Sequence, residues 1–315
     1  SPATEVVVLV DTSATQTGTH RQKTLDAVAG VIATARPDDR FAIAAVDVTS
    51  VQLCDGFHAA NSDAIRDAVR KLDARTPLGT TDIVAALEDA MARFEGKGPK
   101  AVVYVGNGPG LGGVDPDEFA RAVDMLRSSH VAVSAIGIGP QVNWQCLASL
   151  AATSGGMAVI PHHDDDIQAA ARKLGAAAVG PVVWPTEVAL ENQGGNGALR
   201  MLPARFPPLR VDRDSVVLLE GTLDAAKLEL AIGGQGITLS IPATAPHADN
   251  AYLSELARNA GGSDGLFLPV VGREGLSIAK GFIRGEAASL AALAAQAQAS
   301  GAHGSAARLA EASLR

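Results

Sequence analysis

The sequence predicts an α/β fold: a doubly wound, mostly parallel, Rossmann-like sheet, followed by a small β-rich domain and a C-terminal helical segment. Three observations carry this prediction. Short apolar runs alternate with helical stretches up to residue 180, a turn-rich region with five prolines occupies residues 182–245, and alanine-rich helical sequence follows Gly272. Strands that alternate with single helices are typical of right-handed βαβ units. We therefore divide the chain into residues 1–180, 181–270 and 271–315.

The apolar runs of the first domain are too short for amphipathic helices and show no alternation, so they are predicted as strands buried on both faces. These strands are Glu5–Val10, Arg40–Val48, Ala101–Val105, Val131–Ile138 and Gly156–Ile160. Val51–Cys54 follows after a two-residue gap and predicts a short edge strand, antiparallel to its predecessor. The helices predicted between the strands are Arg21–Ala35, Ser62–Asp73, Thr81–Phe94, Pro116–Ser129, Gln145–Thr153 and Asp164–Ala178.

Beyond Gly180 the pattern changes to short β-rich runs. We predict strands at Val216–Glu220, Lys227–Ile232 and Ile237–Ile241, with a hairpin at the glycines between the last two, and a helix at Asp249–Ala260. The helical end carries an apolar residue every seven positions, at Leu276, Ile283, Leu290 and Ala297. This stripe needs cover, and we expect residues 181–315 to dock as one unit that supplies it.

Composition narrows the possible functions. The net charge is −8, and the sequence contains no basic stripe, which argues against a nucleic-acid or anionic-membrane partner. No apolar stretch approaches the ~20 residues of a membrane span. Cys54 and Cys146 lie in apolar surroundings without ligand-like spacing, so we expect them to be small core residues.

The most informative feature is the aspartate that ends the first strand. Asp11 is followed at the second and fourth positions by Ser13 and Thr15. The carboxyl end of a strand is where open α/β sheets bind ligands. One carboxylate and two hydroxyls on a tight turn are hard oxygen donors, which suit a small hard cation such as Mg²⁺.

Two other loops offer further oxygens. Thr81 lies in a glycine-turned loop, Leu78-Gly79-Thr80-Thr81-Asp82, that opens a predicted helix. Asn107 follows the strand Ala101–Val105 directly. Loops at the carboxyl ends of adjacent parallel strands converge, so we expect Asp11, Thr81 and Asn107 to share one accessible surface, with the Thr81 hydroxyl within ~8 Å of the Asp11 carboxylate.

These residues resemble the metal-ion-dependent adhesion site of the von Willebrand factor type A domain, over roughly residues 4–180. The family has D-x-S-x-S, matched by Asp11, Ser13 and Thr15, and a threonine in a G-x-T-[DN] loop, matched by Thr81. The last serine is replaced by Thr15, which keeps the hydroxyl. Asn107 stands where the family has an aspartate; it keeps an oxygen but removes one negative charge, so cation binding should weaken.

The resemblance implies a metal site at Asp11, Ser13, Thr15, Thr81 and Asn107 that holds Mg²⁺, with Mn²⁺ and Ca²⁺ as alternatives. It also implies a non-enzymatic protein-interaction module for adhesion or assembly, whose partner presents an Asp or Glu to the ion. The alternative is a metal-independent structural scaffold, or a turn motif in which Asp11 only bonds loop amides.

Two weaker resemblances concern the rest of the chain. The β segment is loosely similar to the domain that follows this fold in inter-alpha-inhibitor heavy-chain-like proteins, and the helical end is similar to the start of tetratricopeptide-type repeats. Together they imply a module of a larger bacterial envelope or secretion-associated protein, with an extracytoplasmic location favoured over a cytoplasmic one.

Three other motifs are assigned no chemistry. Gly108–Gly113 contains G-x-G-x-x-G, but no helix opens within it as a dinucleotide site requires. The consecutive His162, His163 and Asp164–Asp166 cannot surround one ion, and the acids suit a helix start. An aspartyl phosphatase needs a general acid where Ser13 stands. We therefore expect no catalysis.

Overall fold

The computed structural model describes residues 2–110, 113–161, 166–193, 197–223 and 225–313. Its first domain contains a seven-stranded sheet in the order β3-β2-β1-β5-β6-β7, with β4 also paired to β2. Pairings among β1, β2, β5, β6 and β7 are parallel, whereas β3 and β4 run antiparallel to β2. The strands are β1 (Glu5–Asp11), β2 (Arg40–Val46), β3 (Ser50–Gln52), β4 (His58–Ala59), β5 (Lys100–Gly106), β6 (Ala132–Gly137) and β7 (Ala158–Val159).

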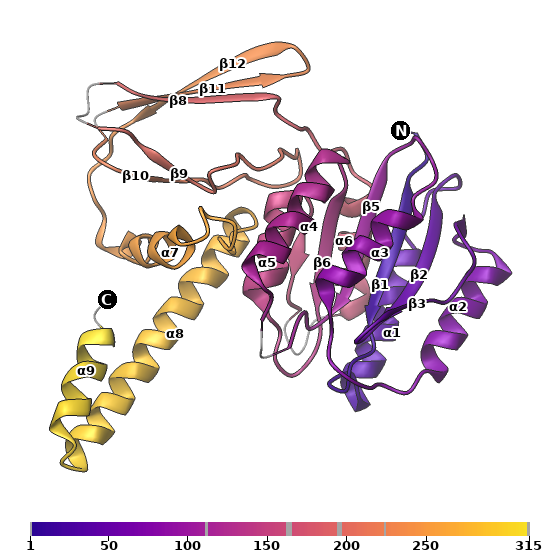
Figure 1. Cartoon of the computed structure of the whole chain (residues 1–315), viewed down its shortest axis with the longest axis horizontal. Helices are drawn as coiled ribbons and strands as arrows, with labels where there is room; N and C mark the ends of the chain where they lie inside the picture. The colour runs from indigo at the N-terminus through magenta and orange to yellow at the C-terminus, as the bar shows by residue number, and fades with distance from the viewer. Residues whose placement is uncertain (1, 111–112, 162–165, 194–196, 224, 314–315) are drawn as a thin grey trace.

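In the described part of this domain, six helices surround the sheet. They are α1 (Gly18–Ile32), α2 (Asp63–Ala74), α3 (Ile83–Arg93), α4 (Pro116–Ser128), α5 (Trp144–Ser154) and α6 (Ile167–Ala178). α1 and α6 pack against each other on one face, while α3, α4 and α5 follow one another along the other face (Figure 1). The predicted doubly wound, mostly parallel fold is confirmed.

Local chemistry explains where these elements begin and end. Val6 to Val10 are at most 1% exposed, as expected for a strand covered by helices on both faces. Ser62 and Asp115 cap α2 and α4 with their side chains, and Pro116 opens α4. The predicted antiparallel edge strand is confirmed as β3, although it begins at Ser50 and is shorter than Val51–Cys54.

The second region contains a three-stranded sheet, β12-β11-β8, and a two-stranded sheet, β10-β9. Gly233 and Gly234 connect β11 to β12 with φ values of +56° and +81°, which confirms the predicted hairpin. β8 and β9 were not predicted, because their charged and half-exposed residues show no clear alternation. The strands are β8 (Glu187–Asn192), β9 (Arg200–Leu202), β10 (Leu218–Glu220), β11 (Ala225–Ile232) and β12 (Gln235–Pro242).

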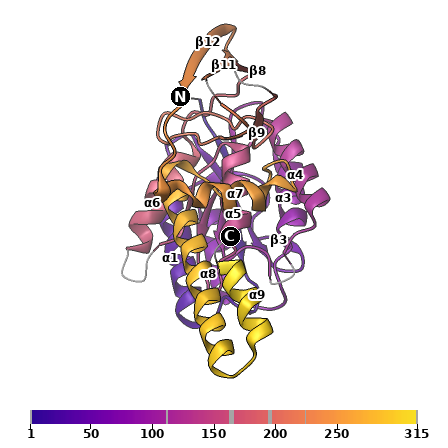
Figure 2. The same ribbon diagram turned by 90° about the vertical axis from the view of Figure 1, so that its left-hand side faces the viewer.

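The helical end consists of a short 3-10 turn at Ala248–Asn250, then α7 (Tyr252–Gly261), α8 (Gly272–Ala299) and α9 (His303–Ser313). α8 and α9 form a hairpin that projects from the body of the molecule (Figure 2). The apolar stripe of α8 has two covers: Leu276 and Ile283 pack near α7, and α9 folds back along the C-terminal half, where Ala294 and Ala306 are buried. The four stripe residues, Leu276, Ile283, Leu290 and Ala297, are all partly buried, so the predicted cover is present but incomplete. Phe282 and Leu293, which lie outside the stripe, remain more than half exposed.

The second region meets the first along the α4–α5 flank. Phe267 stacks on Phe119 of α4 with ring centroids 4.7 Å apart, and Val271 packs with Trp144 of α5. Among the helices within the described ranges, none is long and apolar enough to cross a membrane.

Candidate metal centre

Asp11 is the last residue of β1, between β2 and β5, and its carboxylate accepts four hydrogen bonds. Oδ1 accepts from the Ser13 N–H at 2.8 Å and from the Thr81 hydroxyl at 2.9 Å. Oδ2 accepts from the Tyr104 hydroxyl and the Asn107 N–H, both at 3.2 Å. The loop after β1, the loop before α3 and the loop after β5 therefore converge on one carboxylate.

The other predicted site residues lie beside it. The hydroxyl oxygens of Ser13 and Thr15 are 2.9 Å apart, and the Thr15 hydroxyl donates to Asn107 Oδ1 at 3.1 Å. All five predicted residues thus belong to one hydrogen-bonded cluster. The expected distance limit between Thr81 and Asp11 is met with a wide margin.

The expectation that this cluster lies on an accessible surface is wrong for most of it. Asp11, Ser13, Thr81 and Asn107 are buried, and only Thr15 is exposed. The reason is that the loops bond to each other above the strand ends: the Ala14 N–H donates to the Gly79 carbonyl at 3.1 Å, and the Leu78 N–H to the Thr12 carbonyl at 3.0 Å. Access to the cluster is therefore confined to the neighbourhood of Thr15.

The loop after β5 comes close to Asp11 because β5 ends in a glycine, Gly106. A Cβ atom on Gly106 would lie 2.1 Å from the Asp11 Cβ, closer than any side chain allows. Gly106 therefore makes room for the Asp11 side chain beside β5, and it lets the Asn107 N–H reach the carboxylate.

Charge at the centre comes from a single group. Burial and the nearby Asp11 carboxylate raise the pKa of Tyr104 well above its usual value, so its hydroxyl remains a neutral donor. Asp47, directly after β2, forms an ion pair with Arg75, whose Nη2 lies 2.7 Å from the Asp47 Oδ2. Burial alone would raise the pKa of Asp47, but hydrogen bonds from Arg75 and Thr49 hold it below its usual value. Asp11 is left as the charged oxygen donor of the cluster.

This donor set fits a small hard cation. It consists of a carboxylate, three hydroxyls and an amide oxygen, which are ligands that Mg²⁺ and Ca²⁺ accept. Within the described ranges, no group of three or more His, Cys, Asp or Glu side chains could hold a metal ion. A softer ion that needs thiolate or imidazole ligands has no such site in that part of the chain.

Two members of the cluster were not predicted. Tyr104 lies inside a strand that the sequence marks only as apolar, yet its hydroxyl bonds both Asp11 and the Gly108 N–H at 3.0 Å. Gln16, next to Thr15, is fully buried and donates to Asn107 Oδ1 at 3.2 Å. A polar residue directly after the D-x-S-x-T pattern was the available signal.

The remaining motifs behave as structural residues where they are described. Cys54 and Cys146 are free and buried, as predicted, and burial raises the pKa of Cys146 to about 12. Asp166 caps α6, while His162, His163, Asp164 and Asp165 lie outside the described residues. Leu111 and Gly112 of the G-x-G-x-x-G stretch are also outside them, and α4 begins only at Pro116.

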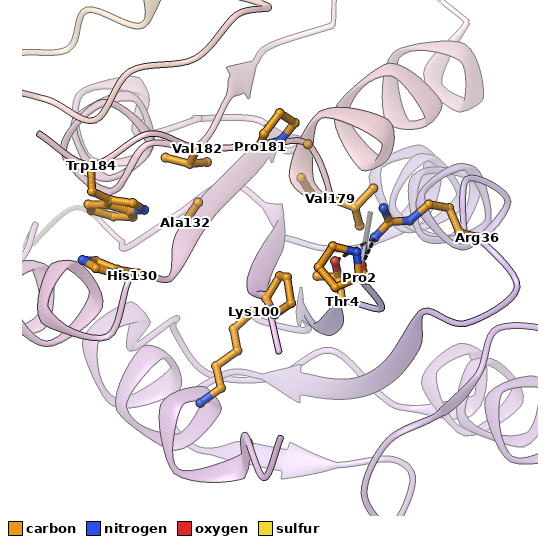
Figure 3. Close-up of a pocket in the computed structure, with 13 residues that line it drawn as sticks. Pro2, Thr4, Arg36, Lys100, His130, Ala132, Val179, Pro181, Val182 and Trp184 are labelled. Atoms are coloured by element: carbon orange, nitrogen blue, oxygen red, sulfur yellow. Dashed lines mark hydrogen bonds between the residues drawn. The ribbon is translucent and has the colours of Figure 1, made fainter. Parts of the chain in front are cut away.

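A separate cavity of about 250 Å³ lies at the amino ends of the strands (Figure 3). At one side His130 and Trp184 stack with ring centroids 4.9 Å apart. Lys100 directs its ammonium group to the Phe94 ring, 5.5 Å from the centroid. Arg36 bonds Asp39 on the opposite side. The side chains of Lys100 and Arg36, which line this cavity, are thus both engaged by other residues of the protein.

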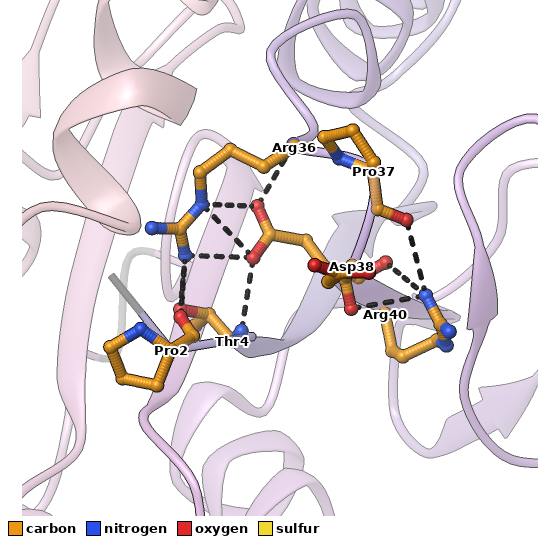
Figure 4. A network of polar contacts seen from close by, with 7 residues as sticks. Pro2, Thr4, Arg36, Pro37, Asp38 and Arg40 are labelled. Atoms are coloured by element: carbon orange, nitrogen blue, oxygen red, sulfur yellow. Dashed lines mark hydrogen bonds and ion pairs between the residues drawn. The ribbon is translucent and has the colours of Figure 1, made fainter.

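The ion pair of Arg36 and Asp39 fastens the N-terminal segment (Figure 4). Arg36 Nη2 lies 2.7 Å from Asp39 Oδ1 and also donates to the Pro2 carbonyl at 3.1 Å. The Thr4 N–H donates to the same Asp39 oxygen at 2.9 Å. These bonds hold the chain directly before β1, at the end opposite to Asp11.

Several solved structures are similar to this chain. A von Willebrand factor type A protein from Catenulispora acidiphila is 14% identical, covers 82% of this chain and 72% of its own, and has a TM-score of 0.53. The ArnB paralog VWA2 from Sulfolobus acidocaldarius is 14% identical over 98% of this chain and 78% of its own, with a TM-score of 0.45. An aerotolerance-related membrane protein from Bacteroides fragilis is 16% identical over 55% and 98%, with a TM-score of 0.44.

The family assignment follows from the sequence model for the von Willebrand factor type A domain, which matches residues 4–160. The match covers β1 to β7 and every member of the cluster around Asp11. Domains of this family are typically modules for protein interaction. Residues 4–160 of this chain therefore belong to the von Willebrand factor type A family.

Proposed function

We propose that this chain is a non-enzymatic protein-interaction module that holds a Mg²⁺ ion at Asp11, Ser13, Thr15, Thr81 and Asn107. Mn²⁺ and Ca²⁺ are the alternative ions. An acidic side chain of a protein partner completes the coordination. The ion supplies a positive charge to a cluster whose charged oxygen donor is Asp11.

One observation carries the proposal: the Thr81 hydroxyl lies 2.9 Å from an Asp11 oxygen in a cluster of five oxygen-bearing side chains from three loops. A divalent cation binds oxygen at about 2.0–2.6 Å, so it needs donors already gathered at this spacing. Each loop is fixed by strand pairing or by backbone hydrogen bonds, which reduces the cost of ordering the ligands.

The charge of the cluster supports an acidic partner. With Asn at position 107, a bound divalent ion meets one carboxylate and keeps a net positive charge. A carboxylate from a partner neutralises that charge at a partly dehydrated site, where the attraction exceeds its value in bulk water. Thr15, the exposed member, is where a partner reaches the ion.

Calorimetric titration with MgCl₂ tests the metal. We expect heat with the wild-type protein and none with Asp11→Ala. Asp82→Asn is the matched control, because Asp82 is an exposed acid one residue from Thr81 that caps α3, a role that asparagine also fills. Heat in all three proteins would assign the binding to surface charge, and no heat in wild type would remove the metal.

A metal-independent scaffold is the second candidate, favoured by the four hydrogen bonds that already occupy the Asp11 carboxylate. Asn107→Asp separates the two functions. A large Mg²⁺-dependent rise in Tm of this variant, with no rise in wild type, would favour the scaffold. For the partner, capture from a lysate with and without chelator tests whether the interaction depends on the ion.

A further inference from the structure

Gln16 connects the loop after β1 to the loop after β5 through a fully buried side chain. Its Nε2 donates to the Ile138 carbonyl at 2.8 Å and to Asn107 Oδ1 at 3.2 Å. Its Oε1 accepts from the Thr24 hydroxyl of α1 at 2.9 Å. Both amide hydrogens of Gln16 are therefore used, and the residue is 0% exposed.

The orientation of this amide is fixed by chemistry. A backbone carbonyl only accepts hydrogen bonds, so the Ile138 oxygen requires the NH₂ group of Gln16 and would repel its Oε1. The oxygen consequently faces the Thr24 hydroxyl, which can donate. One amide hydrogen is left to point at Asn107.

The Asn107 amide is then fixed in turn. Its Oδ1 must face the hydrogen donated by Gln16, because an NH₂ group there would place two donors against each other. At the other end Asn107 Nδ2 donates to the Gln141 carbonyl at 3.4 Å, a second group that only accepts. The two backbone carbonyls, Ile138 and Gln141, thus hold the Asn107 oxygen on the side of Thr15.

The directions of these hydrogen bonds also determine which hydroxyl groups keep free lone pairs. Thr15 donates its hydrogen to Asn107 Oδ1, so the hydrogen bond between Thr15 and Ser13 must be donated by Ser13. Thr81 donates to Asp11. Ser13 Oγ and Thr81 Oγ1 therefore point acceptor lone pairs, rather than hydrogens, away from these bonds.

We propose that Gln16 is a positioning residue that makes Asn107 present oxygen, and not NH₂, to the cation cluster. An asparagine has one oxygen where an aspartate has two, so replacing the carboxylate leaves the site dependent on which way the amide is turned. Gln16 removes that ambiguity. The affinity part of this inference rests on the proposed function, and the orientation of the amide does not.

A double-mutant cycle tests the role of Gln16 in Mg²⁺ binding. Gln16→Met is close in size and removes both donors. We expect it to weaken Mg²⁺ binding by about 10–100-fold, the usual effect of losing a group that orients a ligand. In the Asn107→Asp background the fall should be much smaller, because either carboxylate oxygen serves after rotation. Equal falls in both backgrounds would overturn the proposal and leave Gln16 a packing residue.

Thr24→Val is the matched control. It removes the partner of Gln16 Oε1 but leaves the bonds to Ile138 and Asn107, so we expect Mg²⁺ affinity close to wild type. A loss as large as that of Gln16→Met would contradict an effect through the Asn107 amide.

A second measurement needs no metal. In the metal-free protein, both Nε2 hydrogens of Gln16 should exchange with water more slowly than those of exposed side-chain amides, followed by NMR. Gln16→Met should shift and deprotect the Asn107 amide. Fast exchange at Gln16 would reject the orientation itself. Slow exchange with no Mg²⁺ binding in either background would reject the proposed function, and with it the role in binding, but retain the fixed Asn107 amide.

Discussion

The hydroxyl of Thr81 lies 2.9 Å from Oδ1 of Asp11, although the two residues are 70 positions apart. Asp11 ends the central strand β1, and Thr81 precedes α3 in a loop whose Leu78 bonds the loop after β1. Their hydrogen bond therefore connects the central strand of the sheet to the loop before α3.

Thr81→Val should lower the free energy of unfolding by about 1.5–3 kcal/mol, because the buried carboxylate loses one of its donors. Chemical denaturation at neutral pH measures this change. The control is Thr80→Val, at an exposed neighbouring position. It should change the free energy by less than about 0.5 kcal/mol. Equal losses in both variants would show that the bond to Asp11 contributes nothing.

Tyr104→Phe should cost about 1–3 kcal/mol, since it leaves the buried Gly108 N–H and one side of Asp11 Oδ2 without a partner. The pKa of Tyr104 is raised in the folded protein by burial and by Asp11. Its contribution to stability is therefore complete below pH ~10, the unfolded value, and is lost as the pH rises above it.

Absorbance at 295 nm checks that pH dependence. The chain has two tyrosines, Tyr104 and Tyr252. In a Tyr252→Phe background, which leaves Tyr104 as the only tyrosine, the signal should appear only when alkali unfolds the chain. Ionisation of Tyr104 before unfolding would contradict its burial.

Asp39→Asn should destabilise the protein at neutral pH and flatten its response to acid. Burial raises the pKa of Asp39, but hydrogen bonds from Arg36 and from the Thr4 N–H outweigh burial and lower it. The stabilisation is present above the unfolded value of about 4 and disappears as the pH falls through the lower folded value. Thermal unfolding of both proteins at a series of pH values from about 2 to about 7 tests this pH dependence. If the Tm of both proteins falls equally with decreasing pH, the Asp39 carboxylate makes no contribution to the acid dependence of stability.

Phe267→Leu should weaken the contact between the two regions, because it removes the stack on Phe119. The expected loss of stability is about 0.5–1.5 kcal/mol beyond the change in buried area. Phe282→Leu is the matched control, since Phe282 is 57% exposed on α8. If the control loses as much stability, the effect belongs to the change from Phe to Leu itself and not to the stack on Phe119.

The sequence was sufficient for the sheet and for the convergence of Asp11, Ser13 and Thr81, because parallel strands end at a common edge. It was not sufficient for the burial of that cluster, which depends on backbone bonds between the loops at Ala14 and Gly79. For a similar reason, the sequence could not predict that Tyr104 belongs to the cluster. An aromatic residue in an apolar strand predicts core packing, and only the register with β1 brings its hydroxyl to Asp11.

β8 shows a different limit. Its sequence, with Glu187 and Glu191 on an exposed face, has too little alternation to mark a strand, and it is β11 that holds it in the sheet. The apolar stripe of α8 was visible in the sequence, but its cover by α9 depends on the turn at Gly301, which folds the chain back.

The central position of β1 also sets the order in which the chain can mature during synthesis. β1 leaves the ribosome first, but its second neighbour, β5, ends at Gly106. The carbonyl that orients Gln16 belongs to Ile138, later still. A nascent chain therefore carries Asp11 with an incomplete environment for most of the translation of this domain, and non-local pairing of this kind is slow to form. The completed cluster marks a chain whose central sheet has closed, so a partner that selects it discriminates against immature copies.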